Sequence, residues 1–261
     1  MVESFSLGQS LVLALWGFIA INEMLGVYVG GWHRPLIAGT VAGIILGDIN
    51  TGLAVGATLE LASLGVHCYG GAAIPDYTTG AILGTAFGIL TGKGVETAMA
   101  FAIPIALLGT YLDVLARLST TVLVHKADQC AEDGNTDKIW SLHLLGSIPW
   151  GLSRAIPIFL GTFFGAEIAQ VFLNAVPVWL INGFGAAGRA MPALGIAMLL
   201  SYLPLSEYWI FAIVGFTLAA YFKLNLIAVG LLGISIAIAF TMLMFNPGKS
   251  AKQDQSIGGD L

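Results

Sequence analysis

The sequence predicts an all-α integral membrane protein that crosses the bilayer several times. Of its 261 residues, 57% are hydrophobic and only 10% are charged, and the mean hydropathy is +0.88. Soluble domains carry about 25% charged residues, so this chain is not expected to fold in water around one large core. We count about eight to ten apolar segments, and several are shorter than a full span of roughly 20 residues. Short apolar segments predict re-entrant or broken helices.

The composition also argues against other classes of protein. A net charge of -5 provides no basic surface for nucleic acid. The two cysteines, Cys68 and Cys130, are far apart and have no metal-binding or redox spacing, so we expect ordinary free thiols. The sequence contains no P-loop and no recognisable nucleophile set. We therefore expect no cofactor, no bound metal and no catalytic residue.

The apolar stretches follow one another with short polar interruptions. The first is interrupted by Asn22 and Glu23, and we expect Glu23 either near an interface or turned inward. The next stretch contains small residues at intervals of four, which place them on one helix face and allow helix backbones to pack closely in lipid. These glycines are Gly39, Gly43 and Gly47, with Gly52 and Gly56 repeating the interval. The apolar stretches cover residues 7–30, 33–77, 80–90, 95–124, 140–164, 166–180, 181–203, 208–221 and 226–245.

Two polar, glycine-rich interruptions occur, one in each half of the chain. Residues 48–52 (DINTG) are turn formers, and they predict either a loop between two short spans or a broken helix of the kind that transporters use at substrate sites. Residues 182–192, which begin with Asn182, are a second candidate broken segment. One interruption per half hints at a structural repeat.

Ionisable residues inside apolar segments are candidates for function, because each is costly to place in lipid. Glu60 has apolar neighbours on both sides and is predicted to be a ligand. Asp76 follows a proline and is either a ligand or the N-cap of the next helix, through the Thr78 or Thr79 amide. His67 is either a satisfied core histidine or a ligand.

Other charged residues have structural interpretations. Asp113 and Arg117 are four residues apart, which is the spacing of an intrahelical ion pair. Arg154 is difficult to place in lipid, so it is expected to face protein, the bilayer interface or water. The polar loop 125–138 divides a single transmembrane domain, residues 1–248, into halves 1–124 and 139–248. Residues 249–261 form a polar tail.

These residues together predict a transporter of a small polar solute. Carboxylates accept hydrogen bonds from sugar hydroxyls, and Tyr77 is able to stack on the apolar face of a pyranose. One alternative is an ion-coupled secondary transporter, in which Asp48 or Glu60 carries protons or sodium. Another is an intramembrane enzyme with Glu60 and Asp76 as paired acids, but it lacks a nucleophile or metal set.

Several motifs in a fixed order resemble one family over essentially the whole chain. The run HRPLIAGTVAGIILGDINTGLAVGATLELASLG, followed by GAAIPD, resembles the hallmark region of the mannose-family IIC membrane component of the bacterial phosphotransferase system. The segments KADQCAEDGNTDKI, NAVPVWLINGFGAAGRAMPALGIAMLL and FKLNLIAVGLLG are further matches. This family includes mannose, fructose, sorbose and N-acetylgalactosamine transporters.

The resemblance implies a sugar-translocating subunit in the bacterial inner membrane. It implies inward movement of a hexose or amino sugar, of the N-acetylgalactosamine or mannose type, for phosphorylation by a IIB partner. The implied partners are a IID membrane subunit, cytoplasmic IIA and IIB phosphocarrier proteins and membrane lipid. The implied assembly is a trimer of IIC–IID pairs with an elevator-like moving core.

The resemblance also places individual residues in motifs. Asp48 falls in the LGD motif, Glu60 in the TLE motif, Asp76 in the PD motif and Asn182 in the ING motif. It favours Glu60 and Asp76 in particular as sugar-facing. Residues 66–69 depart from the mannose transporters, which leaves amino sugars open. The predicted substrate-binding residues are Glu60, Asp76, His67, Asp48, Asn182 and Tyr77.

Overall fold

The computed structural model describes residues 5–64, 66, 74–92, 94–175 and 177–244. These residues form helices and connections without a β-strand, as the sequence predicts. The chain divides into two compact units, residues 1–200 and residues 201–261.

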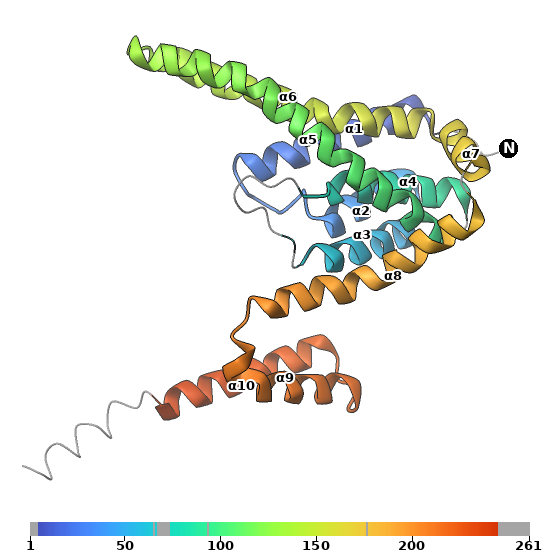
Figure 1. The fold of residues 1–261 in the computed structure, drawn as a ribbon, viewed down its shortest axis with the longest axis vertical. Coiled ribbons are helices and arrows are strands. Elements are labelled where there is room, and N and C mark those ends of the chain that lie inside the picture. The colour runs from blue at the N-terminus through green and yellow to red at the C-terminus, as the bar shows by residue number, and fades with distance from the viewer. Residues whose placement is uncertain (1–4, 65, 67–73, 93, 176, 245–261) are drawn as a thin grey trace, which may run out of the picture. The chain divides into compact units, whose positions relative to one another are not determined.

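The first unit contains eight helices in its described residues (Figure 1). Their bounds are α1 (Leu7–Leu25), α2 (Pro35–Leu46), α3 (Ile49–Ser63), α4 (Tyr77–Thr91), α5 (Val95–Glu132), α6 (Thr136–Phe163), α7 (Gly165–Ala175) and α8 (Val178–Ser201). The second unit contains α9 (Leu205–Ala220) and α10 (Leu226–Met244), which contact each other and expose most of their large apolar side chains.

Helices α2 and α3 form a tight hairpin of two short helices. Gly47 ends α2 in the left-handed conformation, with φ of +89°, and Asp48 caps α3 by accepting a hydrogen bond from the Thr51 amide. A Cβ atom on Gly43 would lie 2.6 Å from the Asp48 carbonyl oxygen and 3.0 Å from the Gly52 Cα. The predicted turn and the predicted close glycine packing are therefore confirmed.

The hairpin is too short to cross a bilayer. Its helices have 12 and 15 residues, which correspond to about 18 and 22 Å at 1.5 Å per residue, against a hydrocarbon core of about 30 Å. Among the described residues, α1, α5 and α6 are long and apolar enough to span. Short packed helices beside full spans agree with the predicted re-entrant or broken elements.

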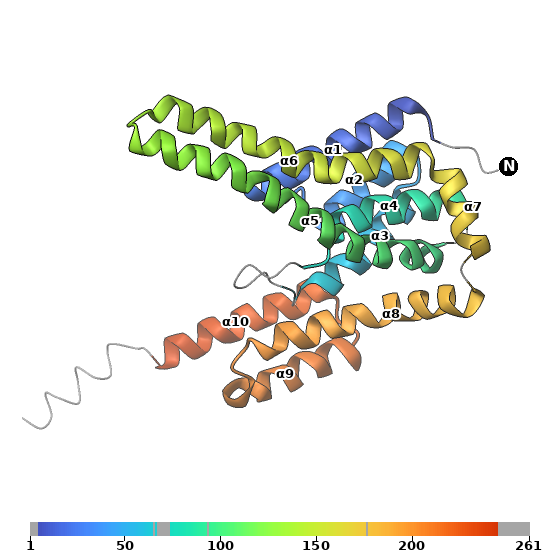
Figure 2. The same cartoon turned by 45° about the horizontal axis from the view of Figure 1, so that its top comes forward.

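Helix α4 lies at the centre of the first unit. It contacts α2, α3, α5 and α6, and it is drawn among α2, α3 and α5 in both Figure 1 and Figure 2. Its small residues allow α5 to approach closely, because a Cβ atom on Gly84 would lie 2.6 Å from the Cβ of Ala102. Its large residues Ile82 and Phe87 join a buried cluster with Leu13 of α1 and Ile158 of α6.

Helices α5 and α6 are the longest elements of the unit, and their far ends extend beyond its other helices (Figure 2). Their 38 and 28 residues correspond to about 57 and 42 Å. The polar segment 125–138 is mostly helical, because α5 continues to Glu132 and α6 begins at Thr136. The connection is reduced to residues 133–135, with Gly134 at φ of +70°.

The second predicted interruption is wrong. Residues 182–192 lie inside α8, which continues through Pro192 to Ser201. Ending a helix in an apolar environment would leave many backbone groups unpaired, so a membrane helix continues through glycine and proline that would end a helix in water. A small residue is needed further along α8, at Gly195, because a Cβ atom there would lie 2.9 Å from the Ala62 carbonyl oxygen of α3.

Candidate functional site

Glu60 of α3 lies beside the first turn of α2. Its Oε1 atom pairs with the Arg34 guanidinium, and its Oε2 atom is 3.4 Å from the Leu36 amide nitrogen. Pro35 has no N–H and Arg34 provides no side-chain cap, so Glu60 supplies negative charge to this helix terminus from a neighbouring helix. The Glu60 side chain is 15% exposed, and each of its oxygens keeps a lone pair for a further donor.

The connection before Arg34 is organised by Glu23 of α1. One carboxylate oxygen, Oε1, accepts hydrogen bonds from the amides of Val29, Gly30 and Gly31 at 2.9, 2.9 and 2.8 Å. The other oxygen, Oε2, is 3.1 Å from Nδ1 of His33. Glu23 is therefore turned inward, which is one of the two positions expected from the sequence, and it is buried.

The N-terminus of α4 approaches the same end of the hairpin. Asp76 caps α4 by accepting hydrogen bonds from the Thr79 amide at 3.1 Å and the Thr79 hydroxyl at 2.6 Å, which confirms the capping interpretation. The Thr78 hydroxyl donates a hydrogen bond to the carbonyl of His33. Tyr77 is buried in a cluster that also contains Leu59 of α3.

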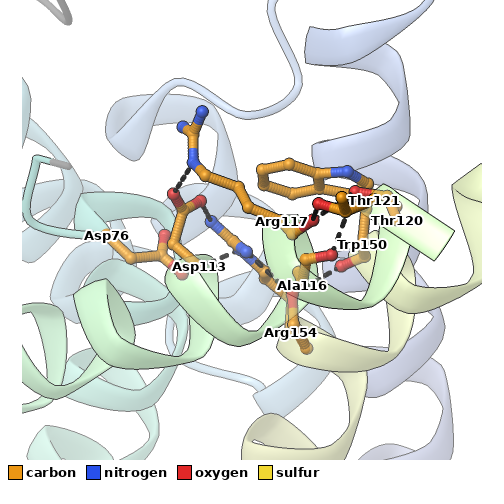
Figure 3. A network of polar contacts seen from close by, with 9 residues as sticks. Asp76, Asp113, Ala116, Arg117, Thr120, Thr121, Trp150 and Arg154 are labelled. Carbon is orange, nitrogen blue, oxygen red and sulfur yellow. Dashed lines mark hydrogen bonds and ion pairs between the residues drawn. The ribbon is translucent and has the colours of Figure 1, made fainter. Parts of the chain in front are cut away.

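Asp76 also belongs to a network of four charged side chains (Figure 3). Nε of Arg154 lies 3.1 Å from Oδ2 of Asp76 without hydrogen-bond alignment, and Nη2 donates to Oδ1 of Asp113 at 2.8 Å. Nε of Arg117 donates to Oδ2 of Asp113 at 2.9 Å. The two guanidinium carbons lie 5.3 and 5.6 Å from the centroid of Trp150, close enough for cation–π contact. Two acidic and two basic groups thus neutralise one another between α4, α5 and α6.

Part of this network follows from the sequence. The spacing of Asp113 and Arg117 predicts their pairing, and the structure confirms it. Arg154 faces protein, which is one of its expected positions. The pairing of Arg154 with Asp76 was not predicted. The available signal was an arginine inside an apolar segment, because such a group needs a carboxylate partner, but the sequence does not say which one.

The structure does not bring all the predicted ligands together. Glu60, Tyr77 and Asp76 lie at one end of the α2–α3 hairpin, whereas Asp48 caps the other end, about 18 Å away along α3. The Thr51 hydroxyl also donates a hydrogen bond to Oδ2 of Asp48 at 2.6 Å. Asn182 is exposed on α8, about 20 Å along that helix from Gly195, which lies against α3. His67 lies outside the described residues.

The polar groups of this region are hydrogen-bond donors and acceptors of the kind that bind a polar solute. Charged and hydroxyl groups meet beside apolar helices, and the described residues contain no group of histidines, cysteines and acids arranged to hold a metal ion. Long apolar helices, a short re-entrant-type hairpin and a partly exposed carboxylate at its end define a multi-pass membrane protein of the transporting class.

Comparison with known proteins identifies the family within this class. Residues 7–239 match the family described as the sorbose-specific IIC component of the phosphotransferase system. The chain therefore belongs to the mannose-type family of phosphotransferase IIC components, as the motifs predict.

Individual relatives are similar over most of their length. The chain is 35% identical to the sorbose-specific EIIC component of Lacticaseibacillus casei over 96% of this chain and 90% of the relative. It is 34% identical to the mannose-specific EIIC component of Escherichia coli K12 over 81% and 80%. A solved structure of the mannose transporter ManYZ with microcin E492 has a TM-score of 0.60 and 31% identity, and the match covers 94% of this chain and 99% of that chain.

Family membership establishes the coarse function. The chain is a multi-pass protein of the bacterial inner membrane and a sugar-permease component, that is, a transport subunit and not a catalytic one. Further relatives are named for fructose and N-acetylgalactosamine at 32% identity. Similar identity to proteins named for four sugars defines a class of permease without selecting one sugar.

Proposed function

We propose that this chain is the sugar-translocating IIC subunit of a phosphoenolpyruvate-dependent phosphotransferase system. It binds a hexose or amino sugar, of the mannose or N-acetylgalactosamine type, and moves it inward for phosphorylation by a IIB partner. Residues 1–248 work as one transport domain together with a IID membrane subunit, and IIA supplies phosphate to IIB. The complex is a trimer of IIC–IID pairs with an elevator-like motion. Family membership is the main support for this proposal.

The observation that favours a sugar site is the environment of Glu60. Its carboxylate is held by Arg34 and by the first free amide of α2, and it remains 15% exposed. A fixed carboxylate with free lone pairs is a strong acceptor for two sugar hydroxyl groups. Glu60 is therefore proposed to contact the sugar directly.

The other predicted ligands have different support. Asp76 and Tyr77 lie at the same end of the hairpin as Glu60, but Asp76 already accepts from Thr79 and faces Arg154, and the Tyr77 ring is buried. We propose that these two side chains support the site without contacting the sugar. The roles of Asp48 and Asn182 rest on the sequence motifs alone, and that of His67 rests on its place as an ionisable residue in an apolar stretch.

The two candidate transport mechanisms differ in their driving force. Membrane vesicles containing this chain and its IID partner are incubated with labelled mannose or N-acetylgalactosamine, with and without phosphoenolpyruvate and the soluble phosphocarriers inside. The proposal expects accumulation of sugar phosphate only with the donor chain. Uptake driven by a proton or sodium gradient alone would instead support the secondary transporter, which family membership does not favour.

A further inference from the structure

The connection between α1 and α2 is folded around one carboxylate. Three consecutive amides, from Val29 to Gly31, converge on Oε1 of Glu23. Gly31 has φ of +66°, a left-handed conformation that glycine adopts without strain, and it lets the backbone turn these amides inward. Glu23 is 7% exposed and its oxygens are occupied by the connection, so it has no free face for a solute.

His33 links this connection to the helices that carry the proposed sugar site. Its Nδ1 atom contacts Oε2 of Glu23, while its carbonyl accepts the Thr78 hydroxyl from the first turn of α4. The next residue is Arg34, which pairs with Glu60. The backbone is therefore tethered from two helices immediately before Arg34.

We infer that Glu23 and His33 are positioning residues that hold Arg34 against Glu60, and through Arg34 they set the place of the Glu60 carboxylate. This inference deepens the proposed function, on which it rests. Arg34 is 42% exposed and has a long side chain, so it would lose its contact readily on a mobile backbone. Tethering His33 to both α1 and α4 removes much of that backbone freedom before the sugar binds.

The position of Arg34 is measurable without any sugar. In full-length chain with Cys68 and Cys130 replaced by alanine and with its IID partner present, Arg34→Cys and Glu60→Cys are joined by a short bifunctional thiol reagent. We expect Glu23→Ala to lower the cross-linking yield several-fold. Glu23→Gln is the matched control, because its carbonyl still accepts the three amides. His33→Leu should lower the yield and His33→Asn should restore it, since the asparagine amide occupies the place of Nδ1.

The link to sugar binding is tested with native Arg34 and Glu60, using mannose and N-acetylgalactosamine as probes. We expect Glu23→Ala to weaken binding about tenfold, within the range measured for residues of one hydrogen-bond network. Combined with Glu60→Gln, it should add little further loss, because both changes disable the same carboxylate. A purely structural role would make the two losses multiply.

The outcomes separate the two proposals. Unchanged cross-linking in both Glu23→Ala and His33→Leu would overturn the positioning inference, whatever the sugar data show. A loss of cross-linking with normal sugar affinity would retain the positioning inference and overturn the sugar role of Glu60. If Glu23→Ala fails to assemble, the His33→Leu and His33→Asn pair decides the question alone.

Discussion

Arg154 should be among the most costly side chains to remove from the first unit. Its side chain is 5% exposed, and it faces Asp76 and Asp113 at 3.1 and 2.8 Å. In Arg154→Met, Asp113 would keep Arg117, whereas Asp76 would keep only its hydrogen bonds from Thr79. Removing one partner of a buried ion pair costs about 3–5 kcal/mol, because the other charge stays buried without compensation.

The measurement is the melting temperature of the purified protein in detergent. For a chain of this size the cost corresponds to a decrease of roughly 6–20 °C. Arg117→Met is the matched control: its side chain is 45% exposed, so it should cost only about 0–1 kcal/mol. Adding Asp76→Asn to Arg154→Met should recover part of the loss, since the amide still caps α4. Equal melting temperatures for native protein and Arg154→Met would refute this reasoning.

Three further changes test other parts of the molecule. Glu60→Gln should lose roughly 1.5–3 kcal/mol of sugar binding while assembly is kept, because a charged acceptor becomes neutral; normal affinity would remove Glu60 from the site. Gly43→Leu should prevent assembly of the hairpin, while Gly146→Ala, with open space around it, should be tolerated; a well-assembled Gly43→Leu protein would contradict the packing. Replacing each of the four histidines by glutamine should leave phosphoryl transfer intact at saturating sugar, because none is expected to carry phosphate, although the changes at His33 and His67 can weaken sugar binding; labelled phosphate on the native subunit would contradict this prediction.

Local features were predictable because they depend on neighbours in the chain. The turn at Asp48 follows from turn-forming residues, and the Asp113–Arg117 pair follows from helical spacing. The capping role of Asp76 required only a proline before it and threonines after it. In each case the partners are at most four residues apart.

Features of the site itself were less predictable. The sequence identifies Glu60 and Arg34 as motif residues, but they are 26 positions apart, and nothing in the motifs says that they pair. Glycine and proline in 182–192 predicted a break, yet a helix in lipid keeps its hydrogen bonds and continues. Polarity in 125–138 predicted a loop, but most of this segment is helical. Polar residues are compatible with helices that extend beyond the hydrocarbon core.

The sequence alone determined the class, the family and the small-residue packing of the hairpin, because hydropathy, motif order and glycine spacing are properties of the chain itself. Only the tertiary structure decided which partners the carboxylates of Glu23, Glu60 and Asp76 find. Glu23 turns to the α1–α2 connection, Glu60 to Arg34, and Asp76 to Arg154. A charge in an apolar protein must find a counter-charge or a set of amides, and which one it finds depends on which helices the fold places beside it.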